Sequence, residues 1–308
     1  MAIQFSVVHD LNETKRLWET FSPHKTIDDE WGFRFAWTEP LGLQLHFIVG
    51  SVDGHPIGLL PLQRNTNVGI GQKLLQAEKP FLEFFGGVDT DDNAVFLFPE
   101  YRSHAHEFFE QIQTPAILTS LTTPVTLPHA STTHYLDRFE LDLRDIADFS
   151  VFLQKHFDGK SRQRLINRMN HFHKHYSVSV KDGNASDLSL LFEYSKQRFG
   201  TNSSFHMEYR QHVFQKLAKQ FPVDIFVIHL DDIPKAIAFG IMYKESYISL
   251  NMGYDYEIRD LAKLVFATQI QRAIEKGYTR YDAGQGDNGW KEGFHLIKIP
   301  QYKLVLNF

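Results

Sequence analysis

The stretch VDIFVIHLDDIPKAIAFGIMYKESYISLNMGY, which runs from Val223 to Tyr254, contains three apolar segments of strand length. Asp231–Asp232 and Lys244–Glu245 interrupt it, and each pair is short enough to form the turn of a hairpin. The stretch therefore predicts three consecutive antiparallel strands, over residues 223–230, 235–243 and 246–254.

The sequence after this meander predicts a crossover and a fourth strand. An amphipathic helix is expected over Leu261–Lys276, with Gly277 at its C-terminal end, and a strand over Tyr278–Asp282. A glycine-rich run, residues 283–291, separates it from a last strand over Ile297–Leu306. Upstream of the meander we expect a strand over 176–181 and helices over 148–156, 160–175, 186–199 and 207–220. This order gives a mixed sheet with helices on its faces.

The first half of the chain predicts shorter elements. Asp53–Gly54 lies between two apolar runs and indicates a β-hairpin. Strands are expected over residues 3–8, 44–52, 56–63, 116–119 and 135–141, and helices over 12–21 and 101–111. The 119–134 segment is rich in Thr, Ser and Pro and is expected to be a surface loop. We predict an α/β (α+β) fold with two domains, 1–145 and 146–308.

Composition excludes several classes of function. The chain has 308 residues, a net charge of -5 and no cysteine, which excludes disulfides, thiolate metal sites and a cysteine nucleophile. P-loop, HExxH and EF-hand strings are absent, and so is a Ser–His–Asp order, which disfavours NTPases, zinc proteases and hydrolases. Neither a signal peptide nor an apolar span is evident, so a cytoplasmic protein is expected.

Three stretches carry a resemblance to a known family. They are the basic segment Lys160–Arg168, the strand-turn-strand 225–243, and the closing run Gly277–Lys291, in which a strand ending in Asp282 is followed by Gly286 and Trp290–Lys291. From about Asp158 to His295 the chain resembles the CelD-like branch of the GNAT acyltransferase superfamily, to which Fem-type peptidyltransferases are related. The first half resembles the family's N-terminal half-domain, with Gly58–Leu62 as its signature.

The resemblance implies two tandem GNAT-like domains, each a mixed, mostly antiparallel sheet flanked by helices. It implies transfer of an acyl group, with acetyl-CoA or another acyl-CoA as co-substrate and no metal, to an amine or hydroxyl. The acceptor would be a small molecule or a cell-envelope precursor. Fem-type relatives use aminoacyl-tRNA instead. One departure concerns the donor, because the expected glycine-rich phosphate loop is replaced by Tyr256–Leu264, which has no glycine.

Asp282, Lys291 and Tyr254 are the predicted catalytic residues. Asp282 ends a strand before a glycine-rich loop, where it is placed to orient the acceptor or take its proton, or to cap a turn. Lys291 can donate to an anionic group. Tyr254 is a candidate proton donor for the leaving thiolate, with a place in the core as the alternative.

Donor binding is predicted on the third meander strand and at the next helix. The resemblance implies that this strand diverges from its neighbour and offers backbone groups to the donor and to the developing oxyanion. We therefore assign Asn251, Met252 and Gly253 to the donor, with Arg259 and Lys263 supplying charge in place of the missing glycines.

Acceptor binding is predicted on the basic helix and around the closing loop. Residues 155–175 contain six Lys or Arg against one acid, and Arg164 and Arg168 share a helix face. The predicted acceptor residues are Arg162, Arg164, Arg168, Arg198, Phe205, Gly286 and Trp290. The alternative for the arginines is a solvated basic face.

Two further alternatives stay open. His171 and His175 also share a helix face, but no third ligand is evident, so surface histidines are favoured over a metal site. The local basic helix permits tRNA as a donor, whereas the acidic remainder argues against a large nucleic-acid footprint and against DNA. The third hypothesis, beside acyl-CoA-dependent and tRNA-dependent transfer, is a non-catalytic GNAT-like protein that binds a ligand or partner.

Overall fold

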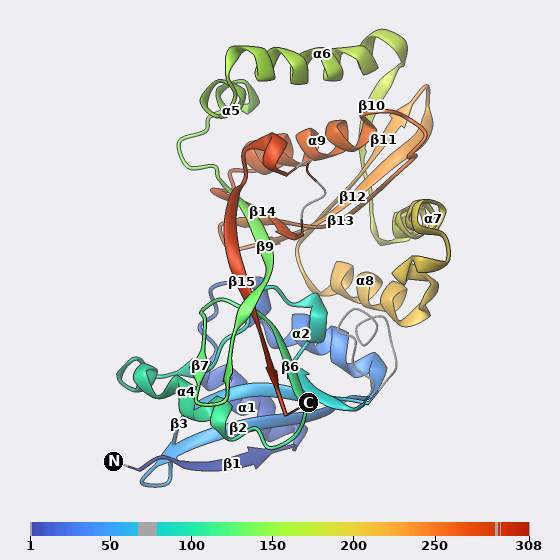
Figure 1. Ribbon diagram of the computed structural model, residues 1–308. Coiled ribbons are helices and arrows are strands. Elements are labelled where there is room, and N and C mark those ends of the chain that lie inside the picture. The colour runs from blue at the N-terminus through green and yellow to red at the C-terminus, as the bar shows by residue number, and fades with distance from the viewer. Residues whose placement is uncertain (1, 67–78, 287–288, 290, 308) are drawn as a thin grey trace. The chain divides into compact units, whose positions relative to one another are not determined.

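The computed structural model describes residues 2–66, 79–286, 289 and 291–307 (Figure 1). The chain forms two compact units, Met1–Asp137 with Pro300–Phe308, and Arg138–Ile299. It passes from the first unit to the second within strand β9 (Thr133–Asp142) and returns within β15 (Ile297–Leu306). Within the described residues, every helix is too short or too polar to cross a bilayer.

Unit 1 contains a mixed sheet with the strand order β1-β2-β3-β4-β6-β15, and β5 pairs with β3. Its pairs are antiparallel except for the parallel contact between β4 and β6. Its other elements, in chain order, are β1 (Gln4–Val8), α1 (Leu11–Phe21), α2 (Trp31–Thr38), β2 (Gln44–Val52), β3 (His55–Asn65), β4 (Phe81–Phe84), β5 (Phe96–Leu97), α4 (Ala105–Glu110), β6 (Ala116–Leu121), β7 (Thr126–Leu127) and β8 (Ala130–Ser131).

A buried arginine organises the helical side of unit 1. Arg34 on α2 is fully buried, and its guanidinium donates to the carbonyls of Phe85 and Asp92 and to Asn93 Oδ1 at 2.6–2.7 Å. The guanidinium also lies 5.2 Å from the ring of Trp18, which is completely buried on α1. These bonds satisfy a charge that would otherwise be costly to bury, and they tie α2 to the loops that follow β4.

Unit 2 contains the sheet order β9-β14-β13-β12-β11-β10, antiparallel except for the pair β13 and β14. Helices α7 and α8 cover one face, and α5, α6 and α9 cover the other (Figure 1). The elements are α5 (Phe149–His156), α6 (Gly159–His175), β10 (Val178–Asp182), α7 (Leu188–Phe199), α8 (Glu208–Gln220), β11 (Val223–Leu230), β12 (Ile233–Tyr243), β13 (Ser246–Tyr254), α9 (Leu261–Glu275) and β14 (Arg280–Gln285).

The predicted fold class is confirmed, because each unit has a mixed, mostly antiparallel sheet flanked by helices. The predicted domain division differs from the observed one. The crossing lies within β9 rather than near Asp145, and residues 300–308 belong to unit 1. The reason is that Leu304 and Leu306 of β15 pack in the core of unit 1 and pair with β6, a long-range contact that local sequence patterns do not contain.

Smaller differences concern unit 1. The expected helix over residues 101–111 is a 3-10 segment, Pro99–His104, followed by the short helix α4. The expected loop over 119–134 contains the small hairpin β7–β8. Helix α2 and strand β4 were not predicted, because their sequences, WGFRFAWT and FLEF, are short and apolar without a clear period.

Glu83 makes the stability of unit 1 depend on pH. This β4 residue is buried, and one carboxyl oxygen accepts from Gln63 Nε2 at 2.8 Å and from Asn65 Nδ2 at 3.0 Å. Burial raises the pKa of Glu83 to about 7, although these two hydrogen bonds oppose the shift. Because the folded state binds this proton more tightly than the unfolded state, the folded state loses stability as the pH rises from about 4.5 to about 7.

We therefore expect Glu83→Gln to be more stable than the wild type by about 3 kcal/mol above pH ~7.5, with the difference vanishing near pH ~4.5. The glutamine carbonyl keeps both hydrogen bonds and removes the buried charge. Urea unfolding of both proteins across this pH range measures the difference. A difference that is independent of pH would contradict the assignment.

Arg272 fastens α9 to β11 in unit 2. Its Nε and Nη2 donate to the two oxygens of Asp224 at 2.8 and 2.6 Å, and Tyr247 Oη donates to Asp224 at 2.9 Å. Burial alone would raise the pKa of Asp224, but the hydrogen bonds from Arg272 and Tyr247 lower it below its ordinary value. The ion pair therefore stabilises the fold above the ordinary carboxyl pKa, and this contribution is lost as the pH falls through the lowered value.

We expect Asp224→Asn to lower the free energy of unfolding by about 2 kcal/mol near neutral pH, since the partly buried Arg272 loses its buried counter-charge and keeps only the exposed Asp182. The loss should be smaller at pH ~3, because the contribution of the ion pair to stability declines as the pH falls below the ordinary carboxyl pKa. Chemical unfolding of the two proteins at both pH values checks this. Equal losses at both pH values would show that packing, rather than charge, is responsible.

Candidate active site

Strands β13 and β14 run side by side for three residues and then part. Their pairing joins Ser246–Ile248 to Arg280–Asp282, and no further pair between them occurs in the described residues. On its other edge β13 has a bulge, because Gly240 faces Ser249 and Phe239 faces Asn251, which leaves Leu250 as an extra residue. A bulge increases the local twist of a strand. Beyond this point the backbone of β13 has no pairing with β14 among the described residues, and we refer to this separation of the two strands as the opening.

A hydrogen-bonded trio lies on the α9 face at the point of divergence. Ser249 Oγ and Tyr281 Oη both donate to Gln269 Oε1, at 3.0 and 3.1 Å. Gln269 is fully buried, and its Nε2 has no partner among the described residues. Burial raises the pKa of Tyr281, so its phenol stays protonated. The trio connects both strands to α9 where they begin to separate, and it was not predicted from the sequence.

Asp282 lies at the same point but on the opposite face, because side chains alternate along a strand. Its side chain is largely buried, and Oδ1 accepts from the backbone N–H of Gly284 at 2.9 Å. Oδ2 lies 3.8 Å from Arg138 Nε. Asp282 is the third residue of β14 and the last one that pairs with β13, so the predicted place at the end of the strand is corrected, because the strand continues to Gln285.

Glu140 on β9 lies directly opposite Asp282 in the strand register. It pairs with Arg138, and Arg280 Nη1 lies 3.8 Å from its carboxylate. Burial raises the pKa of Glu140; the charge of Asp282 adds to the shift, and the charges of Arg138 and Arg280 oppose it. Two carboxylates and two guanidinium groups therefore meet where β13 and β14 diverge, and the pKa of one of the acids, Glu140, is raised above its ordinary value.

Arg138, Glu140 and Arg280 were missed from the sequence. The alternation of the 135–141 segment does place Arg138 and Glu140 on one strand face, opposite the buried Phe139 and Leu141. What the pattern does not contain is the pairing of β9 with β14, which brings these residues to Asp282.

Lys291 has a different environment from the one expected of a substrate-binding group. Its ammonium is buried and donates to the carbonyls of Ala283, Gly284 and Gln285 at 2.7–3.0 Å. All three donors therefore bind the end of β14, and Lys291 positions this segment. Gly286 follows with a φ of 73°, a left-handed conformation that favours glycine. The predicted acceptor residue Trp290 lies outside the described residues.

The predicted donor residues on β13 lie past the bulge. Asn251 Oδ1 accepts from the backbone N–H of Met252 at 2.8 Å. Gly253 packs against α7, where an added Cβ would lie 3.2 Å from the Cα of Leu191, so this glycine is required for packing. Met252 packs partly into the apolar cluster beneath α9. All three residues border the opening. Gly253 has no side chain, so only its backbone can contact a donor.

Two predicted residues near α7 have different surroundings. The guanidinium of Arg198 lies 5.1 Å from the ring centroid of Tyr254, a cation–π contact that joins two predicted site residues. Phe205 is 1% exposed and packs between Phe192 and Phe214, with centroids 4.8 and 4.9 Å away. The prediction that Phe205 contacts the acceptor is therefore corrected, because the side chain belongs to the apolar core under α7 and α8.

Cations gather at the N-terminus of α9. Asp260 caps the helix and pairs with Lys263 at 2.6 Å, and it lies 3.8 Å from both Arg168 and Arg259. Burial alone would raise the pKa of Asp260, but the hydrogen bond and charge of Lys263 lower it. The structure thus joins Arg168, predicted for the acceptor, to Arg259 and Lys263, predicted for the donor, around one carboxylate.

The remaining predicted arginines lie on α6. Arg164 is exposed and Arg162 half-buried, and within the described residues the arginine near Asp282 is Arg138. His171 and His175 are neighbours on this helix, with ring centroids 4.3 Å apart. No group of three or more potential ligands for a metal occurs within the described residues.

Known proteins resemble this chain in sequence over one unit and in structure over both. Residues 159–292 match the family model of the acetyltransferase (GNAT) domain. No curated protein matches the chain.

Solved structures similar to the whole chain include FemX, with a TM-score of 0.60 and 11% identity over 98% of each chain. The C-terminal domain of a putative lysylphosphatidylglycerol synthetase from Agrobacterium fabrum has a TM-score of 0.58 and 12% identity, over 96% of this chain and 92% of the other. A tandem GNAT protein from the clavulanic acid biosynthesis pathway has a TM-score of 0.54 and 11% identity, over 100% and 99%.

At these identities the solved structures establish the fold alone. The family model covers the meander, α9 and β14, which are the elements that form the opening beyond Ile248. Residues 159–292 therefore match an acetyltransferase (GNAT) domain, and the structures similar to the whole chain share its fold.

Proposed function

We propose that this protein transfers an acyl group, acetyl in the simplest case, from an acyl-CoA to an amine or hydroxyl of a small-molecule or cell-envelope-precursor acceptor. The main support is one observation: β13 and β14 diverge beside a carboxylate whose pKa is raised by burial. The opening accommodates an extended donor against backbone groups, and the carboxylate is available to the attacking group.

The acceptor attacks the thioester carbonyl directly, without a covalent enzyme intermediate. Its lone pair forms the new bond to carbon, its proton passes to Glu140, and the carbon–sulfur bond breaks to release CoA as a thiolate that is then protonated. Free backbone N–H groups of β13 stabilise the developing oxyanion. Tyr254 is the candidate acid for the thiolate.

Glu140 replaces Asp282 as our choice of base. Asp282 accepts a backbone hydrogen bond from Gly284 and lies beside Arg138, so it orients that guanidinium. Burial raises the pKa of Glu140 above its ordinary value, which makes its carboxylate a better proton acceptor. Arg138 and Arg280 keep its ionised form accessible, and Lys291 keeps the end of β14 in place.

The donor's phosphates are assigned to the start of α9. Arg168, Arg259 and Lys263 supply three positive charges there against the single charge of Asp260. A helix N-terminus adds a partial positive charge. This group takes the place of the glycine-rich phosphate loop that the 256–264 segment lacks.

A Fem-like transfer from aminoacyl-tRNA is the second candidate. The exposed basic residues of α6, including Arg164 and Lys174, favour it, because phosphate backbones are bound by such surfaces. The two donors would bind to different surfaces. Acyl-CoA would bind to the cations at the start of α9, and tRNA would bind to the broad basic face of α6.

The donor is tested by calorimetric titration with acetyl-CoA, longer acyl-CoAs and free CoA. We expect an acyl-CoA to bind, and the double variant Arg259→Ala/Lys263→Ala to bind about tenfold or more weakly, since two phosphate-binding charges are lost. Lys219→Ala, an exposed lysine on α8, is the matched control and should bind like the wild type. If no CoA compound binds at millimolar concentration while tRNA binds in a salt-sensitive manner, the Fem-like donor replaces acyl-CoA.

The base is tested by Glu140→Gln with the preferred acyl-CoA and a panel of amines, by measuring release of the free thiol. We expect kcat to fall about a hundredfold or more with KM changed little, because the glutamine cannot accept the proton. In the wild type, kcat/KM should rise with pH through the raised pKa of Glu140, and the variant should lack this limb. The exposed Glu193→Gln on α7 is the control, and an unchanged kcat in Glu140→Gln would exclude Glu140 as the base.

A further inference from the structure

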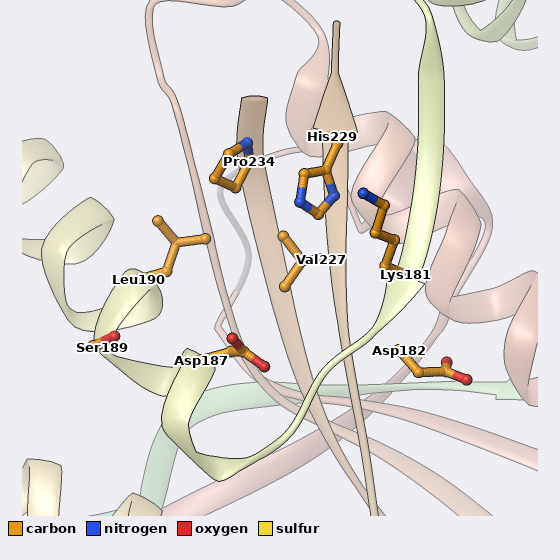
Figure 2. A pocket seen from close by; sticks show the side chains of 8 residues that line it. All are labelled: Lys181, Asp182, Asp187, Ser189, Leu190, Val227, His229 and Pro234. Atoms are coloured by element: carbon orange, nitrogen blue, oxygen red, sulfur yellow. The ribbon is translucent and has the colours of Figure 1, made fainter. Parts of the chain in front are cut away.

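A second hollow lies in unit 2 on the α7 face of strands β10 and β11. Its volume is about 360 Å³, within the lower part of the range of small-molecule sites. Figure 2 shows the side chains that line it, from β10, β11, the start of β12 and the start of α7. Those used below are Lys181, Asp187, Leu190, Val227, His229 and Pro234.

One end of this hollow has two nitrogen groups that the protein leaves unpaired. In Figure 2 the amino group of Lys181 points towards the imidazole of His229. Within the described residues Lys181 has no ion pair or side-chain hydrogen bond, and His229 Nδ1 is inaccessible to solvent yet has no partner. Ser179, which faces His229 across the two strands, also has a buried hydroxyl without a partner. Buried polar groups normally find a partner, and Ser179 Oγ and His229 Nδ1 have none here, whereas Lys181 is exposed and its charge is accessible from solvent.

The other end of the hollow is acidic. Asp187 Oδ2 accepts from the backbone N–H of Asn184 at 2.8 Å, which fixes the carboxylate in the capping box of the 3-10 turn Ala185–Asp187, directly before α7. Figure 2 shows this carboxylate across the hollow from His229 and Lys181. Leu190, Val227 and Pro234 form apolar walls between the two ends.

This distribution of charge selects the chemical class of the ligand. A purely anionic molecule would be repelled by Asp187, and a purely cationic one by Lys181. A small zwitterion satisfies both ends, with its carboxylate at Lys181 and His229 and its ammonium at Asp187. The apolar walls suit an aliphatic side chain. We propose that the hollow between β10, β11 and α7 binds a free aliphatic amino acid.

This site is distinct from the one assigned to acyl transfer. In the sheet order, β12 and β13 separate β11 from β14, where Asp282 and Glu140 lie. Its occupancy is therefore measured by binding alone, without an acyl donor or an acceptor.

The experiment is a calorimetric titration of the full chain with L-leucine. Isocaproate, which lacks the ammonium, and isoamylamine, which lacks the carboxylate, are the matched ligands. We expect leucine to bind at least about tenfold more tightly than either, because each analogue leaves one end of the site unpaired. Absence of leucine binding at millimolar concentration, or equal binding of isocaproate, would overturn the proposal.

The location is tested with Lys181→Met, which keeps the aliphatic stem and removes the charge. We expect its affinity for leucine to fall about tenfold or more, with an unfolding midpoint equal to that of the wild type. Lys219→Met on α8 is the matched control and should bind leucine like the wild type. Leucine binding that Lys181→Met leaves unchanged would place the ligand elsewhere and overturn the assignment.

Discussion

An extra residue in one strand, Leu250 in β13, is the constraint on which the site of unit 2 depends. Two regular parallel strands would satisfy each other's backbone groups along their whole length and leave nothing for a ligand. Here the pairing stops at Ile248 and Asp282, and each unmade backbone bond costs on the order of 1 kcal/mol. The separation is held by bonds from α9: Gln269 ties Ser249 to Tyr281, and Arg272 fixes the helix to Asp224. The opening is thus built into the packed core rather than into a surface loop.

Two charge clusters flank this opening, and their composition differs. At Asp282 two acids face two arginines, so the charges balance and burial raises the pKa of one of the acids. At Asp260 three cations surround one carboxylate, which leaves an excess of positive charge at a helix N-terminus. A balanced cluster suits proton transfer, and an unbalanced one suits an anion. The net charge of -5 for the whole chain does not reveal either of these local charge clusters.

Much of unit 2 could be predicted from the sequence, because its signals are local. The 223–254 meander and the long helix α9 with Gly277 at its end follow from periodicity and turn residues. Contacts between distant residues could not be predicted. Periodicity marks Arg138 and Glu140 as neighbours but does not show that β9 pairs with β14. The sequence alone does not show whether an aromatic residue such as Phe205 lies in the core or in a binding site. The burial of its side chain in the structure does.

The path of the chain through β9 and β15 has a consequence for biosynthesis. Unit 1 needs Leu304 and Leu306 in its core and β15 beside β6, yet these residues leave the ribosome after all of unit 2. Folding from the N-terminus during translation therefore reaches a stage at which β6 is an uncovered sheet edge. Unit 2 can assemble its sheet in the meantime, since Arg138–Ile299 is continuous. The edge of β6 therefore stays exposed in the nascent protein until β15 has been synthesised.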